Sequence, residues 1–361
     1  MEKILLEDCC EILDSMRVPI TSSNRVEGPY PYYGANGIQD HVAEYIFDDE
    51  LVLLAEDGGN FGSKERPIAY RVSGKCWVNN HAHVLKPKDG LDVDYLCYSL
   101  MFYDVGGMVN GATRQKLTQA AMRQMLIPKR SIEDQQYIVK LLGKVVSIKE
   151  ERRHQLEELD NLIKARFVEM FGTPYGNEKG FPMKTVDEVI EFTGGAQPDK
   201  KYFEYEPSED NIRLIQIRDY KTDNYITYIP KSMAKRFCDA DDIMIGRYGP
   251  PIFQILKGIE GSYNVALMKA TPRMGNKEFV RHFLMQDCLF NYLDGLSQRT
   301  AGQSGIEIPA LKAYPFPYPP IDLQNEFEQF AKQIDKSKVA VEKALDETQT
   351  LFDSLMQDYF G

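Results

Sequence analysis

Two stretches of this sequence repeat one another and decide how the rest is interpreted. Residues 127–135 are IPKRSIEDQ and residues 316–324 are FPYPPIDLQ, so proline, isoleucine and glutamine coincide at an offset of 189 positions. The same offset, without gaps, gives further matches: Leu156 with Leu345, Glu158 with Glu347, Leu162 with Leu351, and Phe171-Gly172 with Phe360-Gly361. Several matches in one register indicate an internal repeat. We therefore divide the chain into two halves, residues 1–172 and 173–361.

Each repeated stretch precedes a predicted long helix. An acidic first turn follows Pro128 and Pro317, as helix N-termini favour, and apolar residues then recur every three to four positions. These residues are Ile138, Leu141, Val145, Ile148, Leu159 and Leu162 in the first half, and Phe327, Phe330, Ile334, Val341, Ala344, Leu351 and Leu355 in the second. A helix of about 40 residues is about 60 Å long and cannot bury so narrow a stripe on itself. The equivalent helix is the expected partner, and a two-fold relation between the halves predicts an antiparallel pair.

The rest of each half is predicted to be a globular domain of mixed structure. Short strand-like runs, separated by Gly, Asn and Asp turns, precede a helix-like stretch at 94–103 and another at 278–293. The predicted fold class is α+β, with two mixed α/β domains joined by two long antiparallel helices that form a coiled coil. The domains are placed at 1–126 and 173–316, and the helix regions at 127–172 and 317–361.

Composition limits the classes of function. The chain has 361 residues, of which 43% are hydrophobic and 27% charged, and this suits two or three folded domains. We expect a cytoplasmic protein, because there is no run of about 18 apolar residues for a membrane span and the acidic start is unlike a signal peptide. Six cysteines without a CxxC pair favour reduced thiols. Taken alone, the net charge of −11 counts against a nucleic-acid binder.

No pattern in the sequence predicts a catalytic site. A phosphate-binding loop, a GxGxxG fingerprint and the catalytic loop of amino-methyltransferases are all missing. Asp199, Asp219 and Lys221 fit a loose nuclease pattern whose carboxylates hold Mg²⁺, but turn and strand-end roles are the favoured reading. His81 and His83 lie on one face of a strand, as two metal ligands do, yet no third ligand stands at a suitable spacing. Hydrogen bonding at a strand end is the favoured role for both histidines.

The order of several motifs resembles one family. Residues 111–117, GATRQKL, lead to Ile127-Pro128 and a long helix, and 301–306, AGQSGI, lead in the same way to Phe316-Pro317. This arrangement is similar to the end of a target-recognition domain in the DNA specificity subunit of type I restriction–modification systems. Further similar motifs are 32–38, 55–59, 78–84, 214–219 and 246–249. The second half lacks the YGANG and NNH motifs of the first, which implies recognition domains of different subtypes that read different sequences.

The resemblance implies a function for the whole chain. Each globular domain reads one half of a bipartite site in double-stranded DNA, and the helix pair sets the spacer between the half-sites. The partners are two modification subunits, which carry adenine methyltransferase activity and S-adenosylmethionine, and restriction subunits that use ATP and Mg²⁺. This chain itself has no catalytic role, no cofactor and no metal. A related methylase–nuclease system, a coiled-coil protein scaffold and a stand-alone nuclease remain alternatives.

Polar residues in Gly-rich loops are the candidate DNA contacts, because such side chains read base edges and hold phosphates. The candidates in the first half are Tyr33, Asn36, Asn60, Lys64, Asn79, Asn80, Arg114 and Lys116. Those in the second half are Arg218, Arg247, Tyr248, Asn264, Gln298, Arg299, Gln303 and Ser304. For each residue, turn formation or strand-end hydrogen bonding is the alternative role.

The distribution of charge changes the meaning of the acidity. The first globular region, 1–126, carries −6, the first helix region, 127–172, carries +1, and the second half carries −6. The acid is thus spread over both domains rather than held in a tail. A subunit that reads bases and leaves phosphate neutralisation to basic partners can have this balance. We expect it to bind DNA weakly alone and tightly in its complex.

Overall fold

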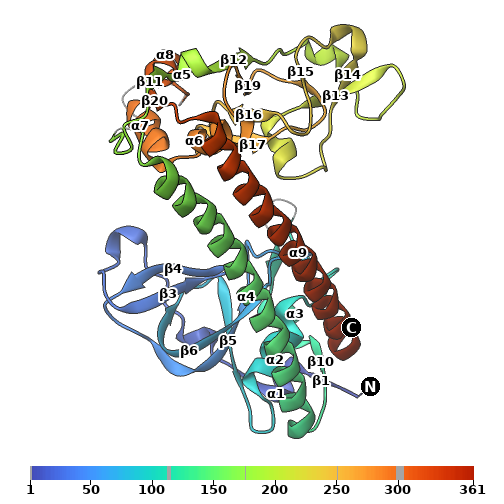
Figure 1. Ribbon diagram of the computed structural model, residues 1–361. Helices are drawn as coiled ribbons and strands as arrows, with labels where there is room; N and C mark the ends of the chain where they lie inside the picture. Colours follow the sequence, from blue (N-terminus) through green and yellow to red (C-terminus); the bar gives the residue numbers. More distant parts are fainter. Residues whose placement is uncertain (1, 112–114, 175, 250, 298–304) are drawn as a thin grey trace. The chain divides into compact units, whose positions relative to one another are not determined.

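The computed structural model of the protein describes residues 2–111, 115–174, 176–249, 251–297 and 305–361 (Figure 1). The chain forms two compact units. Unit 1 consists of Met1–Arg153 with Lys343–Gly361, and unit 2 consists of His154–Glu342. Each unit contains a globular part and one end of each long helix. These units cut across the four predicted segments, so that division into domains and helix regions stays a prediction.

The two long helices are present as predicted. Helix α4 spans Ile132–Phe171 and helix α9 spans Ile321–Phe360, each with 40 residues. Their first and last residues are separated by the 189 positions of the sequence repeat. Gly172 follows α4 with a φ of 72°, a left-handed conformation that glycine adopts easily at a helix end. The repeated Phe-Gly pair therefore ends the helix in the first half.

A short strand pair at the start of each long helix is also repeated. Strand β1 (Lys3–Leu5) pairs with β10 (Leu126–Pro128), and β11 (Met183–Thr185) pairs with β20 (Pro315–Pro317), both antiparallel. A one-turn helix follows the first strand of each pair, α1 (Leu6–Cys9) or α5 (Val186–Val189). Lys3 faces Pro128 and Met183 faces Pro317, so the register is the same in both. The first strands of the two pairs, β1 and β11, lie 180 positions apart rather than 189. For this reason one ungapped sequence register does not reveal this repeat.

Unit 1 contains a six-stranded sheet. Its strand order is β2 (Cys10–Ile12), β7 (Ala82–Pro87), β5 (Phe47–Ala55), β6 (Ala69–Val78), β3 (Tyr30–Gly34) and β4 (Gly37–Val42). All neighbours are antiparallel except β3 and β6. Residues 51–55 of β5 are fully buried at the centre. The smaller elements are α2 (Val93–Met101), β8 (Val109–Asn110), β9 (Lys116–Leu117) and α3 (Gln119–Arg123).

Unit 2 contains two four-stranded sheets instead. The first has the order β12 (Ile190–Gly194), β19 (Leu267–Pro272), β16 (Ile243–Gly246), β17 (Gln254–Lys257), and the second has β14 (Tyr228–Pro230), β13 (Asn211–Ile215), β18 (Gly261–Tyr263), β15 (Phe237–Cys238). Helices α6 (Lys277–Leu284), α7 (Asp287–Ser297) and α8 (Ile308–Ala313) complete the unit. The α+β fold class is confirmed, while the sheets differ between the halves.

The single helix predicted at 278–293 is wrong, because two helices occupy this stretch. Helix α6 ends at Leu284 with Met285 as its C-cap, and Asp287 begins α7. The buried apolar residues explain the break. They follow helical spacing up to Leu284, but the next buried residue is Leu289, five positions later. One straight helix would turn Leu289 and Leu293 away from the core that they share with Phe283.

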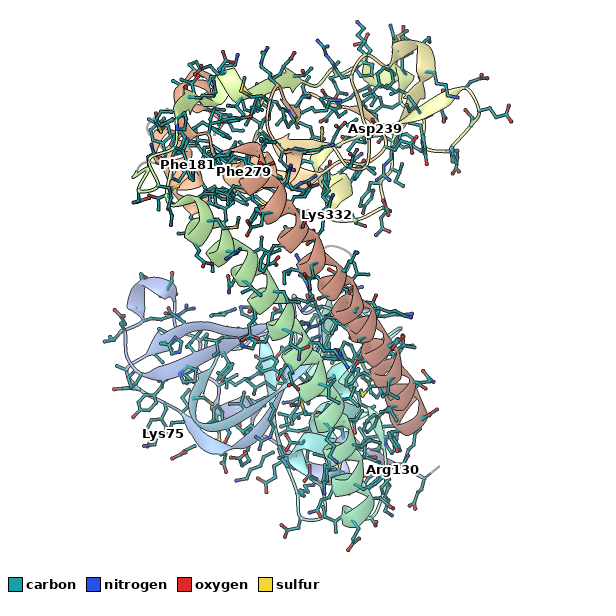
Figure 2. All side chains as sticks on the ribbon, viewed as in Figure 1. Lys75, Arg130, Phe181, Asp239, Phe279 and Lys332 are labelled. Atoms are coloured by element: carbon teal, nitrogen blue, oxygen red, sulfur yellow. The ribbon has the colours of Figure 1, made fainter. Side chains whose placement is uncertain are left out.

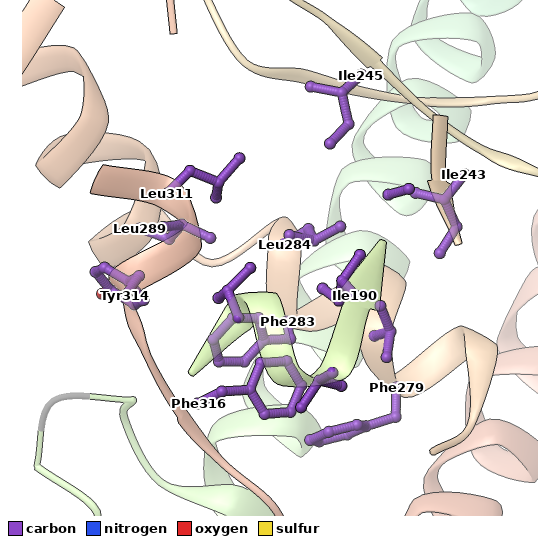
Figure 3. Close-up of a cluster of buried hydrophobic side chains, with 14 of the residues drawn as sticks. Ile190, Ile243, Ile245, Phe279, Phe283, Leu284, Leu289, Leu311, Tyr314 and Phe316 are labelled. Carbon is purple, nitrogen blue, oxygen red and sulfur yellow. The ribbon is translucent and has the colours of Figure 1, made fainter. Parts of the chain in front are cut away.

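The helix ends pack in an antiparallel manner within each unit. In unit 1, the start of α4 (Ile138, Leu142) packs with the end of α9 (Phe352) and with Tyr95 of α2. In unit 2, the start of α9 packs with the end of α4 and with Phe279 of α6, which is labelled in Figures 2 and 3. The helix residues of this core are Phe327, Ala331, Phe167 and Phe171. The ring centroids of Phe360 and Tyr95 lie 5.2 Å apart, and those of Phe171 and Phe279 lie 4.7 Å apart. Equivalent residues therefore bury both helix ends, and the predicted antiparallel pair is confirmed.

Charged contacts add direction to this packing. The Arg130 guanidinium, labelled in Figure 2, lies 5.6 Å from the Tyr359 ring centroid and donates to the Tyr359 carbonyl in the last turn of α9. A cation is favourable at a helix C-terminus. In unit 2, Lys338 of α9 and Asp160 of α4 form an ion pair of 2.6 Å.

Two further findings concern the described chain as a whole. All six cysteines lie in its described parts, and none of them forms a disulfide bond. Among the described helices, none is both long enough and apolar enough to cross a membrane.

Candidate nucleic-acid interface

Three loops meet at one edge of the six-stranded sheet in unit 1. Asn36 lies in the tight turn between β3 and β4, and its side-chain amide donates to the Gly58 carbonyl at 3.0 Å. The Asn60 amide donates to Asn36 Oδ1 at 3.2 Å. Gly58 in turn donates its backbone N–H to the Gln115 carbonyl, next to Lys116. The structure thus brings together Asn36, Asn60 and Lys116, three of the predicted contacts, at an exposed loop cluster.

A buried network of charges lies beneath this loop cluster. His83 Nδ1 is 2.6 Å from Asp14 Oδ2, and its Nε2 is 2.9 Å from the Leu117 carbonyl. Arg17 is 2.6 Å from Glu56 Oε2 and 3.4 Å from Asp14 Oδ2. The network is completed by Lys116, 2.9 Å from Glu56 Oε1, and by Gln119, which donates to Asp14. We call this set, Asp14, Arg17, Glu56, His83, Lys116 and Gln119, the charge network.

The charge network holds both acids in their ionised form. Burial would raise the pKa of Asp14, but hydrogen bonds from His83 and Val84 and the charge of Arg17 lower it below the ordinary value. Burial likewise opposes ionisation of Glu56, and hydrogen bonds from Arg17 and Lys116 lower its pKa. His83 Nδ1 faces the Asp14 carboxylate and Nε2 faces the Leu117 carbonyl, so both ring nitrogens have partners inside the network. The network therefore fixes the segment around Leu117 against strands β5 and β7.

Asp14, Glu56 and His83 also have the geometry of a metal-ligand trio. One ligand atom of each lies within 4.8 Å of the others. However, the carboxylates already face the cations Arg17 and Lys116, and His83 Nε2 faces a carbonyl. A metal ion would have to displace these partners, so the residues do not fit a metal site. The other histidine of the predicted pair, His81, is not a member of this trio, and its Nδ1 lies 2.7 Å from Asp57 Oδ1.

The other candidates of the first half occupy different positions. Asn79 is 3% exposed; its amide donates to Gln39, and its Oδ1 accepts from the His81 backbone, as the turn-forming alternative expects. Asn80 is exposed in the same turn, and the half-buried Tyr33 stacks near Tyr70 at 5.8 Å. Lys64 lines a cavity of about 700 Å³ with Tyr98, Phe102 and Phe360. Arg114 lies outside the described residues.

Unit 2 presents a different surface beside strands β13 and β14. Arg218, one of the predicted contacts, lines an open hollow of about 390 Å³ whose other walls are largely aromatic: Tyr205, Tyr225 and Tyr228, with Pro207, Asp223, Asn224 and Ile226. The Arg218 guanidinium lies 5.8 Å from the Tyr225 ring centroid and donates to Thr227 Oγ1. Tyr205 and Tyr225 are 71% and 63% exposed. Exposed aromatic rings beside an arginine can stack on bases or hold a phosphate.

A second group in unit 2 lies at the end of strand β16. Arg247 donates to the Val265 carbonyl, and its guanidinium lies 5.2 Å from the Tyr248 ring. The neighbouring Asn264 is 9% exposed and accepts from the Ala266 backbone, a turn-forming role. Arg247, Tyr248 and Asn264 thus form one group, separate from the Arg218 hollow in their contacts. Gln298, Arg299, Gln303 and Ser304 lie outside the described residues.

The residues of the loose nuclease pattern have structural roles. Asp219 is 7% exposed and accepts the Gln216 backbone N–H at the start of a single 3₁₀ turn, Ile217–Tyr220. Burial raises its pKa, although Gln216 and two arginines oppose this. Asp199 precedes another 3₁₀ turn, Lys200–Tyr202, and lies 3.5 Å from Lys201. These positions agree with the turn and strand-end reading of the pattern.

Comparison with known proteins identifies the domain family. Residues 1–158 match the family model described as "Type I restriction modification DNA specificity domain". The chain carries a type I DNA specificity domain. The chain is 38% identical over 146 residues to the type I restriction enzyme specificity subunit S.HindORF215P of Haemophilus influenzae. It is 26% identical over 115 residues to the EcoprrI specificity subunit of Escherichia coli.

These sequence matches are partial on both sides. They cover 40% and 32% of this chain, and only 37% and 27% of the two relatives. The fold match is longer. The type I restriction–modification S subunit of M. genitalium aligns with 100% of this chain and 96% of its own, with a TM-score of 0.54 and 13% identity. A chain from a structure on assembly and conformational transition of the type I R-M system aligns with 99% of this chain and 97% of its own (TM-score 0.56, 14% identity). The fold of specificity subunits therefore extends beyond the specificity domain of residues 1–158 into the second half.

Sequence reasoning missed the residues that position the specificity domain's loops. Asp14, Arg17, Glu56 and Gln119 are scattered over 105 positions and show no common spacing. Tyr205 and Tyr225 could have been noticed in the sequence as possible surface contacts, since aromatic residues inside acidic, loop-like segments are unusual.

Proposed function

We propose that the chain is the DNA specificity subunit of a type I restriction–modification complex. Each globular part reads one half of a bipartite site in double-stranded DNA, and the helix pair sets the spacer. The observation that carries this proposal is the repeated frame, which consists of the two long helices and the strand pairs that precede them. The two 40-residue helices start and end 189 positions apart, and equivalent residues pack both of their ends. Such a repeat suits a chain that reads two half-sites with two related halves.

Different surfaces at the two ends support an asymmetric site. The first domain offers amide side chains, Asn36 and Asn60, beside Lys116. The second offers Arg218 with exposed tyrosines, and Arg247 with Tyr248. Asn pairs well with adenine and Arg with guanine in the major groove. The two half-sites should therefore differ in sequence.

Repeated exposed apolar residues support docking of two copies of one partner. Leu162 and Leu351 are equivalent in the repeat, and their exposed fractions are 47% and 50%. Ile132 and Ile321 form a second equivalent pair, 37% and 48% exposed. Packing within the described chain does not account for these four side chains. Two equivalent surfaces suit two copies of the modification subunit.

The chemistry then belongs to the partners. In this proposal the modification subunits supply S-adenosylmethionine and methyl transfer, and restriction subunits supply ATP- and Mg²⁺-dependent steps. This chain is non-catalytic and contributes sequence reading in the cytoplasm. Its charge of −11 supports weak DNA binding alone, because counterion release by basic side chains provides most of the non-specific affinity.

Co-expression with the cognate modification subunit, followed by sequencing of adenine methylation in the host genome, tests this function. We expect one asymmetric, bipartite motif with a fixed spacer, and no motif when this chain is omitted. A continuous motif, or a motif that does not depend on this chain, would contradict the proposal. Cleavage by a single fused methylase–nuclease partner would instead assign the chain to the related system.

Charge substitution tests the docking surfaces separately. Leu162→Glu and Leu351→Glu should each lower the number of bound modification subunits from two to one, measured by native mass spectrometry. Exposed Gln136 and Gln333, changed to Glu, are matched controls on the same helices. Retention of both subunits by both leucine variants would remove this part of the proposal and favour other faces of the chain.

A further inference from the structure

One pair of equivalent residues connects each globular part to its long helix by hydrogen bonds. Gln135 and Gln324 lie in the first turn of α4 and α9, at the same repeat position, and are 3% and 0% exposed. A buried glutamine needs partners for two donors and one acceptor. Both side chains find them in their own unit.

The contacts of the two glutamines match. Gln135 Oε1 accepts the backbone N–H of Asp92 at 2.8 Å, and Gln324 Oε1 accepts the backbone N–H of Asn276 at 2.8 Å. Gln135 Nε2 donates to the carbonyls of Arg130 and Gly90, both at 3.0 Å. Gln324 Nε2 donates to the Pro319 carbonyl at 2.7 Å, and Pro319 is the repeat equivalent of Arg130.

The two residues that donate to the glutamine Oε1 atoms stand at the N-termini of globular helices. Asp92 is the N-cap of α2, and its side chain accepts from the backbone of Asp94 and Tyr95. Asn276 is the N-cap of α6, and its side chain accepts from Glu278 and Phe279. Each glutamine therefore ties the first residue of a globular helix to the first turn of a long helix. Tyr95 and Phe279 then carry the aromatic contacts with the helix ends.

We propose that Gln135 and Gln324 are positioning residues that fix the register between each recognition domain and the helix pair, and so make the complex strict about spacer length. Apolar contacts between Tyr95 or Phe279 and the helices tolerate sliding, since dispersion has little directional preference. Hydrogen bonds at fixed angles do not. A base pair adds about 3.4 Å to DNA, so a shift of this size at either end admits the wrong spacer.

The inference rests on the proposed function, but different measurements test them. The bipartite motif of the wild-type complex tests the function, and the spacer lengths accepted by the variants test the positioning role. We would replace each glutamine by Met, which has similar length and no hydrogen-bonding amide, and test the assembled complex on DNA with the native spacer and with one base pair more or less. Methylation of off-length DNA, relative to native DNA, should rise about tenfold, because directional bonds worth roughly this factor are lost. The bases required in each half-site should stay the same.

Controls distinguish positioning from stability. Gln136→Met and Gln333→Met alter exposed glutamines on the same helices and should leave spacer selection unchanged. Gln135→Glu and Gln324→Glu keep the acceptor for the N-cap backbone but lose the amide donor, so their relaxation should be intermediate. These variants also serve if a Met variant does not fold.

Three results have distinct meanings. Relaxed spacing with unchanged half-sites supports the positioning role. A loss of methylation on all substrates in equal proportion, with spacing still strict, overturns it and leaves the glutamines a stabilising role only. If the wild-type complex itself shows no bipartite motif, the proposed function fails first, and the variants are then not interpreted in terms of spacing.

Discussion

The frame and the reading surfaces of this protein differ in how far they repeat. The frame repeats closely: β1 and β11 pair with β10 and β20 in the same register, and Gln135 and Gln324 each accept from the backbone of a helix N-cap. The surfaces differ: unit 1 has one six-stranded sheet and a charge network, and unit 2 has two four-stranded sheets and a tyrosine-lined hollow. Under the proposed function, helix packing and partner docking would constrain the frame, whereas only the bases that are read would constrain the surfaces. The following predictions test this division.

Lengthening the frame should produce the largest effect without touching either surface. Insertion of seven residues after Arg153 and after Glu342, which are equivalent in the repeat and lie at the unit boundaries, adds about 10 Å to the helix pair. We expect the spacer to grow by about three base pairs, with both half-sites unchanged in a methylation map. Insertion in one helix alone misaligns the apolar stripes and should abolish methylation. An unchanged spacer in the double insertion would refute the ruler role of the helices.

Removing an aromatic ring from the frame should reveal unequal ends. Phe279→Ala should destabilise unit 2 by about 4 kcal/mol, because Phe279 contacts the rings of Phe167, Phe171 and Phe316. The equivalent Tyr95 contacts one described ring, Phe360, so Tyr95→Ala should destabilise unit 1 less, by about 3 kcal/mol. Urea denaturation measures the free energy of unfolding, and hydrogen exchange shows which unit loses protection. Equal protection losses in both units from Phe279→Ala would mean that the ends are not independent.

The charge network should make unit 1 sensitive to acid. The lowered pKa values of Asp14 and Glu56 mean that their stabilisation is complete above the ordinary values of 3.8 and 4.5 and is lost as pH falls below them. Asp14→Asn should therefore cost about 2 kcal/mol at pH 7, because the carboxylate accepts hydrogen bonds from Val84 and Gln119. Arg17 keeps its ion pair with Glu56 in this variant. The cost should shrink when denaturation is repeated near pH 3.5. A cost independent of pH would show that the Asp14 charge does not stabilise the fold.

Single changes on the surfaces should have the smallest and most local effects. Arg247→Ala should relax one base of the second half-site, by about 1–2 kcal/mol of discrimination. Lys116→Ala should affect the first half-site only. Methylation of DNA libraries randomised in each half-site measures both changes. A uniform loss over all sequences would instead assign Arg247 to a phosphate contact.

Features of the frame were easier to predict from the sequence than features of the reading surfaces. The long helices were predictable because their 3–4 spacing and Phe-Gly ends are local signals, and the offset of 189 doubled the evidence. The break at Met285 was missed because the stretch contains neither Pro nor Gly before Gly295, and only the five-residue gap between Leu284 and Leu289 signals it. Loop composition selected Asn36, Asn60 and Lys116, whose loops meet in the structure. The same composition could not separate Asn79, whose side chain is buried in a turn.

The sequence by itself determined the repeat, the fold class, the helix pair and the distribution of charge, because each depends on residue order within one segment. Only the tertiary structure decided how Asp14, Glu56, His83 and Gln119 meet beneath the loops, and which backbone groups bond to the repeated glutamine. Hydrogen bonds and ion pairs between distant residues depend on how the strands are ordered in a sheet. That order arises from burial of the whole core, and no local spacing in the chain records it.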